Sequence, residues 1–180
     1  MKMTNDLLIV IDMQRDFITG SLGSEAAQAI VPKVAERVRN HQGPVYYTQD
    51  THGADYLTTQ EGHYLPVEHC RLGTDGWEVE ESIQRALLLK GAQGFEKQGF
   101  GSPTMSHSAM RLHNADALTS ITLCGVCTDI CVIANAMLLK STLPNVPIYV
   151  RADLCAGVSP ESHETALKAM EACQIAIING

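Results

Sequence analysis

Residues 120–132 read S-I-T-L-C-G-V-C-T-D-I-C-V, and this stretch sets the expected architecture. Its first five residues are mostly aliphatic or β-branched, which predicts a buried strand. A helix is expected to follow over about residues 130–140. A strand that passes directly into a helix is the repeating unit of a parallel α/β sheet. The chain on either side of this stretch is therefore expected to repeat the same unit.

Strand and helix signals alternate along the whole chain. The aliphatic run 7–11 predicts a strand buried on both faces, and residues 26–40 have helical spacing. Ser159 and Pro160 predict the start of a last helix, as its N-cap and first-turn residue. The sequence therefore predicts one domain over residues 1–180, a three-layer α/β/α fold with a mainly parallel six-stranded sheet. The other predicted strands are 45–48, 95–96, 120–124, 148–150 and 174–178, and the other predicted helices are 78–89 and 106–113.

Composition is that of an ordinary globular protein, with 45% hydrophobic and 18% charged residues. Lysine and arginine number 13 against 20 acidic residues, and this net charge of −7 argues against nucleic-acid binding. No stretch approaches the roughly 20 apolar residues that span a bilayer, and the first apolar run is too short for an export signal. We expect no membrane partner, a cytoplasmic location and six cysteines that remain reduced.

Polar residues follow several of the predicted strands. In a parallel sheet, ligands bind outside the carboxyl ends of the strands. An acid, a base and a thiol from distant parts of the sequence are therefore expected to meet at one edge. The polar segment 50–77, which shows no clean period, is expected to form a long functional loop there. The residues that fall at this edge are Asp12, Asp50, His52, Lys97 and Cys131.

Three cysteines lie close together in residues 124–131. Their spacing would suit a metal or iron–sulfur site, but Cys124 ends a buried strand and no fourth ligand is near in sequence. Cys124 and Cys127 are interpreted as small buried residues. Cys131 falls in the first turn of the predicted helix, with Asp129 as N-cap, where the helix start lowers a thiol pKa. Cys131 is the predicted nucleophile.

Five motifs occur in order along the chain. They are D-M-Q-R-D-F at 12–17, Q-D-T-H at 49–52, H-C-R-L-G-T at 69–74, E-K at 96–97 and G-V-C-T-D-I-C-V at 125–132. In this order and spacing they resemble the isochorismatase-like cysteine hydrolase superfamily, and within it the nicotinamidases and nicotinamidase-related amidases. The resemblance covers nearly the whole chain.

The resemblance implies a catalytic triad of Asp12, Lys97 and Cys131. Because an amide carbonyl is a poor electrophile, attack needs a thiolate, a proton acceptor and oxyanion stabilisation. Asp12 would take the thiol proton, and Lys97 would hold the carboxylate and favour the thiolate. The backbone amides of Cys127 and Cys131 would form the oxyanion hole, with a cis peptide bond between Val126 and Cys127.

The resemblance also implies a divalent metal beside the triad. Asp50 and His52 match the first pair of ligands, and alternating side chains in an extended segment would point them the same way. His69 matches a later ligand. Glu61 matches the remaining one, with His63 as a competitor. Such mixed ligands suit zinc first, with iron or manganese as alternatives.

The substrate implied by the resemblance is a small-molecule amide, with nicotinamide, cleaved to nicotinate and ammonia, as the first choice. Phe17 matches one of two aromatic residues that hold the pyridine ring. At the second position this chain has Leu65 and Pro66, which weakens the case for nicotinamide unless Phe100 or Tyr56 compensates.

Other hypotheses stay open at this point. The chain could be an N-carbamoylsarcosine-type or ureidoacrylate-type amidase, an isochorismatase, or an inactive homologue that binds a small molecule. A homo-oligomer, dimer or tetramer, is expected, and His163 is interpreted as structural, near a subunit contact. A reversible disulfide from Cys127 or Cys124 to Cys131 is a further hypothesis.

Overall fold

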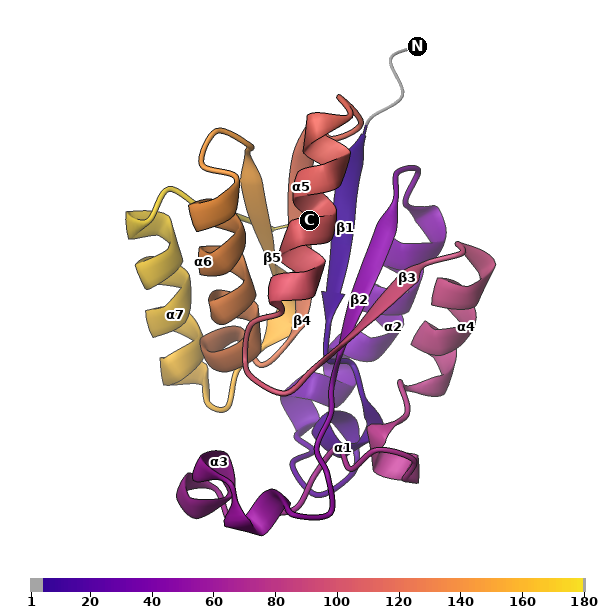
Figure 1. Cartoon of the computed structure of the whole chain (residues 1–180), viewed down its shortest axis with the longest axis vertical. Coiled ribbons are helices and arrows are strands. Elements are labelled where there is room, and N and C mark those ends of the chain that lie inside the picture. The colour runs from indigo at the N-terminus through magenta and orange to yellow at the C-terminus, as the bar shows by residue number, and fades with distance from the viewer. Residues whose placement is uncertain (1–4, 180) are drawn as a thin grey trace.

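The computed structural model describes residues 5–179, which contain a six-stranded sheet in the order β3-β2-β1-β4-β5-β6. Every neighbouring pair of strands is parallel, with Val10 opposite both Tyr47 and Cys124. The expected parallel six-stranded sheet is confirmed. Figure 1 shows the strands side by side with their carboxyl ends directed toward α1 and α3. The strands are β1 (Asp6–Ile11), β2 (Val45–Asp50), β3 (Gln93–Lys97), β4 (Ser120–Val126), β5 (Ile148–Ala156) and β6 (Ala176–Ile178).

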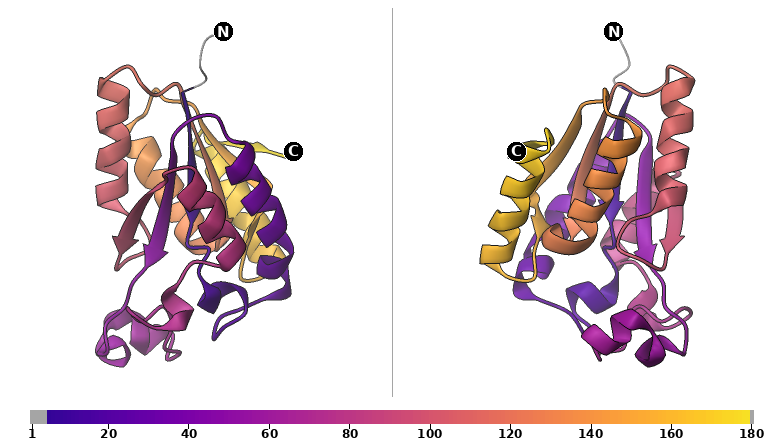
Figure 2. Two further views of the ribbon diagram at one scale, coloured as in Figure 1. Left: turned by 90° about the vertical axis from the view of Figure 1, so that its right-hand side faces the viewer. Right: turned by 60° about the vertical axis from the view of Figure 1, so that its left-hand side comes forward.

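Helices cover both faces of the sheet. The pair α2 and α4 packs on one face, and α5, α6 and α7 lie on the other, as the views in Figures 1 and 2 show. The three-layer α/β/α architecture is thus confirmed. Within residues 5–179, no helix is both long and apolar enough to cross a membrane. The helices are α1 (Arg15–Ile18), α2 (Glu25–Asn40), α3 (Gln60–Tyr64), α4 (Glu81–Leu89), α5 (Pro103–Asn114), α6 (Ile133–Thr142) and α7 (Pro160–Ala172).

Local sequence signals explain where several helices start. The Ser24 hydroxyl accepts the Ala27 N–H at the start of α2, and Ser159 accepts the Ser162 N–H at the start of α7. Each such cap contributes about 1 kcal/mol. The predicted cap of the last helix is confirmed. Helix α4 begins at residue 81 rather than 78, because the Glu80 carboxylate accepts two first-turn N–H groups.

The central strand β1 is the centre of the core. Residues 7–11 are at most 1% exposed, which confirms that this strand is buried on both faces. Burying one large aliphatic side chain contributes about 1.5–3 kcal/mol. This strand therefore gives a rigid base to the residue that follows it, Asp12.

Several sequence expectations need correction. A π-helix, Thr128–Val132, precedes α6, which begins at Ile133 rather than near residue 130. Strand β5 runs on to Ala156, beyond the predicted end at residue 150, because it pairs with the end of β4 after a bulge. The segment 50–77 contains α3 and two 3₁₀ turns rather than a plain loop. Cys127, interpreted from the sequence as a buried residue, is only partly buried.

Candidate active site

A crevice opens at the carboxyl ends of β1 and β4. Strand β1 pairs with β2 on one side and with β4 on the other, and the helices that follow leave toward opposite faces. Asp12 directly follows β1, and the π-helix Thr128–Val132 follows β4. A cavity of about 560 Å³ lies here, lined in part by Cys127 and Cys131. The sheet topology therefore brings the acid and the thiol to one place.

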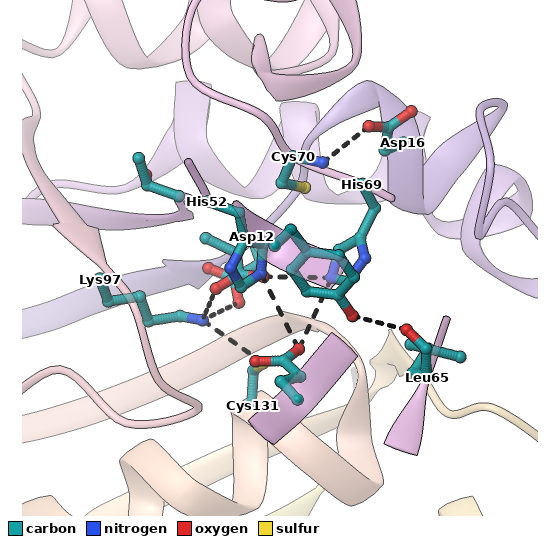
Figure 3. Close-up of polar contacts among 12 residues, drawn as sticks. Asp12, Asp16, His52, Leu65, His69, Cys70, Lys97 and Cys131 are labelled. Carbon is teal, nitrogen blue, oxygen red and sulfur yellow. Dashed lines mark hydrogen bonds and ion pairs between the residues drawn. The ribbon is translucent and has the colours of Figure 1, made fainter. Parts of the chain in front are cut away.

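Lys97 links the acid and the thiol. Its Nζ lies 2.7 Å from Asp12 Oδ2 and 3.5 Å from Cys131 Sγ, as Figure 3 shows. All three residues are at most 6% exposed. The Thr48 hydroxyl donates to Asp12 Oδ1 at 2.6 Å and fixes the carboxylate from the other side. The structure thus brings together the three residues expected to form the triad.

Burial controls the protonation of these groups. Burial raises the pKa of the Asp12 carboxyl, and the Lys97 ammonium opposes that rise. Burial would lower the pKa of Lys97, but Asp12 and the Cys131 thiol raise it, so Lys97 is a cation. Burial and the Asp12 carboxylate together raise the pKa of the Cys131 thiol well above its ordinary value. The thiol is therefore protonated in the free site and needs a base in order to attack.

Two expectations about the segment that carries Cys131 are wrong. The helix start was expected to lower the thiol pKa, but burial and a neighbouring carboxylate outweigh it. Asp129 was expected to cap the helix, but Cys127 holds the N-cap position of the π-helix. The Asp129 carboxylate instead accepts the Val158 N–H at 3.1 Å, which ties the π-helix to the loop after β5.

The turn after β4 packs tightly against β1. Gly125 has a φ of 120°, and a side chain there would collide with the Ile11 carbonyl, so glycine is required. The peptide bond between Val126 and Cys127 is cis, as the resemblance implies. Thr128 Oγ1 and His163 Nδ1 lie 2.8 Å apart, so His163 anchors the π-helix to α7 within this chain.

Four side chains beside the triad form a group that we call the metal group: Asp50, His52, Glu61 and His69. Their potential ligand atoms all lie within 4.8 Å of one another. Nε2 of His52 is 2.8 Å from Asp50 Oδ2, and Nε2 of His69 is 3.7 Å from Glu61 Oε1. Two imidazoles and two carboxylates are a donor set that suits zinc, iron or manganese. The side chains present therefore fit a divalent metal, whereas His63 lies outside this group.

The neighbours of the metal group orient its ligands. His69 Nδ1 donates to the Val67 carbonyl at 2.8 Å, which leaves Nε2 free to face Asp50 and Glu61. Lys97 Nζ lies 3.2 Å from Asp50 Oδ1, so one lysine contacts both the triad and the metal group. The His52 and His69 hydrogen bonds and Lys97 hold the pKa of Asp50 well below its usual range, although burial alone would raise it.

Two aromatic side chains, Phe17 and Tyr56, pack against the histidines of the metal group. The Phe17 ring packs against His69 with centroids 5.5 Å apart, and Phe17 lines the cavity. Tyr56 lies fully buried against His52 and His69, and its hydroxyl donates to the Leu65 carbonyl. Burial raises the pKa of Tyr56 to about 12, so it remains a donor. The idea that Tyr56 serves as a second aromatic wall is therefore wrong, whereas the half-exposed Phe100 does line the cavity.

Sequence comparison identifies the family. The isochorismatase domain family matches residues 6–179 of this chain. The chain belongs to the isochorismatase family. Among curated family members, it is 27% identical over 189 residues to the nicotinamidase/pyrazinamidase of Mycobacterium tuberculosis, covering 95% of this chain and 97% of that protein. It is 24% identical to the nicotinamidase of Schizosaccharomyces pombe, covering 96% and 92% of the two chains.

Solved structures in the isochorismatase family have the same fold. The pyrazinamidase of Pyrococcus horikoshii, determined in complex with zinc, superposes with a TM-score of 0.79 at 27% identity, covering 98% of this chain and 99% of the other. A nicotinamidase/pyrazinamidase of Bacillus subtilis gives a TM-score of 0.84 at 24% identity, covering 97% and 99%. These structures confirm the α/β fold of this isochorismatase-family chain.

Gln14 is a positioning residue that sequence analysis missed. It is fully buried, and its side-chain amide forms two hydrogen bonds with the backbone of Asp50, at 2.7 and 2.8 Å. The same amide donates to the Trp77 carbonyl at 2.9 Å. Gln14 thereby connects the segment of Asp12 to a residue of the metal group. The signal available in the sequence was a polar residue within the first family motif, two positions after Asp12.

Asn135 is a second positioning residue that the sequence did not point to. It is fully buried in α6, and its amide donates to the carbonyls of Cys131 and Phe100 at 2.8 and 3.0 Å. Its oxygen accepts the Ser102 N–H at 2.9 Å. Asn135 therefore joins the segment that bears the thiol to the loop that bears Phe100.

Proposed function

We propose that this protein is an amidohydrolase that cleaves nicotinamide to nicotinate and ammonia through a thioester on Cys131. The curated relatives named as nicotinamidases support the class of reaction. The observation that carries the proposal is the contact of one buried lysine with both a carboxylate and a thiol, beside the metal group. This arrangement suits attack on an unactivated amide.

The first half of the reaction forms the thioester. Because the thiol of Cys131 is protonated in the free site, Asp12 takes its proton as sulfur attacks the amide carbon. The raised pKa of Asp12 makes it a stronger base for this transfer. The backbone N–H groups of Cys127 and Cys131 donate hydrogen bonds to the negatively charged oxygen that forms from the amide carbonyl. Asp12 then returns the proton to nitrogen, and ammonia leaves as the carbon–nitrogen bond breaks.

The second half releases the acid. Water attacks the thioester carbon while Asp12 takes one of its protons, and the carbon–sulfur bond breaks. The proton passes from Asp12 to the departing sulfur, which restores the thiol of Cys131. Lys97 remains protonated throughout, because two carboxylates lie within 3.2 Å of its Nζ. Its fixed charge stabilises each state in which Asp12 or sulfur is negative.

Asp50, His52, Glu61 and His69 would hold a divalent metal, with zinc as the first choice. When bound, the metal supplies a Lewis-acidic point that a heteroaromatic nitrogen can bind. Phe17 packs against His69 at this end of the cavity and offers a ring face to a planar substrate. A planar heteroaromatic amide therefore suits the walls of this site.

The charge of the cavity disfavours substrates that carry a carboxylate. Among the described residues that line it, the only acidic side chains are Asp50 and Glu61, and no lysine or arginine is present. A divalent metal held by these two carboxylates would leave the group with no net charge. Apart from a metal, the described lining therefore offers no cation that could pair with the carboxylates of N-carbamoyl amino acids, ureidoacrylate or isochorismate. A neutral amide fits it better.

Ammonia release tests the proposal. The purified protein, loaded with zinc, is expected to release ammonia from nicotinamide, whereas Cys131→Ala releases none above background. Cys173→Ala is the matched control, because that thiol is exposed and lies outside the cavity. Release from N-carbamoylsarcosine or ureidoacrylate but not from nicotinamide would replace the substrate. Full activity in Cys131→Ala would refute the thioester.

Two further expectations from the sequence stay predictions, besides the single domain over residues 1–180 and the reversible disulfide to Cys131. One is a homo-oligomer, dimer or tetramer, which sedimentation of the purified protein tests. The other is a cytoplasmic location, which fractionation of the source cells tests.

A further inference from the structure

The cavity beside Cys131 is larger than a single-ring carboxamide requires. Its volume of about 560 Å³ lies within the range of about 300–1,000 Å³ that is typical of sites for drug-sized ligands. A small ring amide would leave part of this space to water, and apolar walls that stay in contact with water contribute no burial energy to binding. The remaining space is therefore suited to a further group of the substrate.

The polar and apolar walls of the cavity belong to different elements. The polar wall consists of three members of the metal group: Asp50 at the end of β2, Glu61 in α3 and His69. The apolar wall includes Leu22 in the turn before α2, Ala27 in the first turn of α2, and Val158 after β5. Ser24 also lines this side, but its hydroxyl oxygen accepts the Ala27 N–H at 3.1 Å and is engaged in capping α2. A ligand that fits both walls has a polar head at the metal group and an apolar tail.

Exposed apolar side chains also gather at this cavity. Four of the nine large apolar side chains that are exposed within residues 5–179 line it. Val158 and Tyr64 are 67% and 85% exposed, and apolar groups left in water at a cavity mouth indicate a ligand that covers them. The other two are Leu65 and Phe100.

We propose that the preferred substrate is an uncharged heteroaromatic carboxamide whose ring carries an apolar substituent, packed against Leu22, Ala27 and Val158. This inference rests on the proposed amidase function and deepens it, because it names the part of the substrate that nicotinamide lacks. The substituent is uncharged because the described lining offers no lysine or arginine to pair with an anion.

Two substrates that differ only in a ring substituent test whether the enzyme prefers an apolar group there. Nicotinamide and nicotinamide with a propyl group on the ring are compared by ammonia release. The propyl compound is expected to have a kcat/KM at least about tenfold higher, since even one methylene in an apolar pocket gives about that discrimination. A propyl compound that reacts no faster than nicotinamide overturns the inference but leaves the amidase function intact.

Substitutions in the chain test where the apolar substituent of the substrate binds. Val158→Trp fills the apolar side of the cavity and is expected to reduce the preference for the propyl compound at least about tenfold. Leu88→Trp is the matched control, because Leu88 is 71% exposed on α4 and does not line this cavity. An unchanged preference in Val158→Trp, or an equal loss in Leu88→Trp, refutes the placement of the tail.

Binding to Cys131→Ala separates this inference from the proposed chemistry. By calorimetry, the propyl compound is expected to bind this inactive variant at least about tenfold more tightly than nicotinamide. A nicotinamide with a carboxyethyl group in place of propyl is expected to bind more weakly than the propyl compound, since no cation receives it. This order of binding, with the propyl compound the tightest, would support the proposed apolar substituent even if no amide is hydrolysed. Equal binding of all three compounds refutes it.

Discussion

The Gln14 side chain should stabilise both the fold and the metal group. Substituting leucine removes three hydrogen bonds, two buried ones to the Asp50 backbone and a partly buried one to the Trp77 carbonyl, at 2.7 to 2.9 Å. Leucine has a similar volume, so the main loss is the pairing of buried polar groups rather than a cavity. The expected effect is a less stable protein and a displaced metal ligand.

The size of the effect follows from these contacts. A buried hydrogen bond contributes about 0.5–1.5 kcal/mol, and an orphaned buried N–H costs about 1–3 kcal/mol. Gln14→Leu is therefore expected to lower the free energy of unfolding by about 3 kcal/mol, which for a chain of this size lowers Tm by about 6–12 °C. Loss of a partner that orients a ligand is expected to weaken zinc binding about 10–100-fold.

The assay is urea unfolding of the metal-free protein, followed by calorimetric zinc titration. Gln49→Leu is the matched control: Gln49 donates one 3.2 Å hydrogen bond to the same Trp77 carbonyl. Its loss should cost about 1 kcal/mol and leave zinc affinity within about twofold. Equal destabilisation by both variants, or unchanged zinc affinity in Gln14→Leu, would refute the reasoning.

Zinc at about 100 times its Kd should stabilise the protein by about 2.7 kcal/mol. Glu61→Gln should reduce the zinc-dependent increase in stability, and a chelator should reverse that increase. A Tm that does not change when zinc is added would contradict the assignment of the metal group. Asn135→Leu should lower kcat more than it raises KM, because the Cys131 carbonyl loses its 2.8 Å donor; unchanged kcat would exclude a positioning role. Burial lowers the pKa of His41 below 6.5, so the unfolded chain binds more protons and stability falls as pH drops below 6.5. His41→Gln, which keeps a donor for the Asp6 carbonyl, should lose less stability between about pH 8 and about pH 5.5 than the wild type; equal losses would contradict this assignment.

Much of the fold was predictable because its signals are local. The aliphatic run of β1 and the Ser159 cap of α7 are visible within a few residues of sequence. The rule that parallel strands present their carboxyl ends at one edge then predicted that Asp12 and Lys97 would meet. Their atoms lie 2.7 Å apart in the structure.

Other features could not be predicted, because they depend on partners far away in the sequence. Gln14 bonds to residues 36 and 63 positions away, and no local pattern distinguishes it from an exposed glutamine. The thiol pKa of Cys131 depends on burial and on Asp12, which the helix-start argument ignored. The size of the cavity depends on six separate segments of the chain.

The sequence by itself determined the order of strands and helices, the buried strands, and the residue types that could perform amide chemistry. Periodicity and capping encode these properties locally. The tertiary structure alone decided how burial and neighbouring charges shift the pKa values of these groups, and that the cavity has no lysine or arginine among its described walls. Charge and burial act through space, so the protonation and selectivity of this site exist only once the chain is folded.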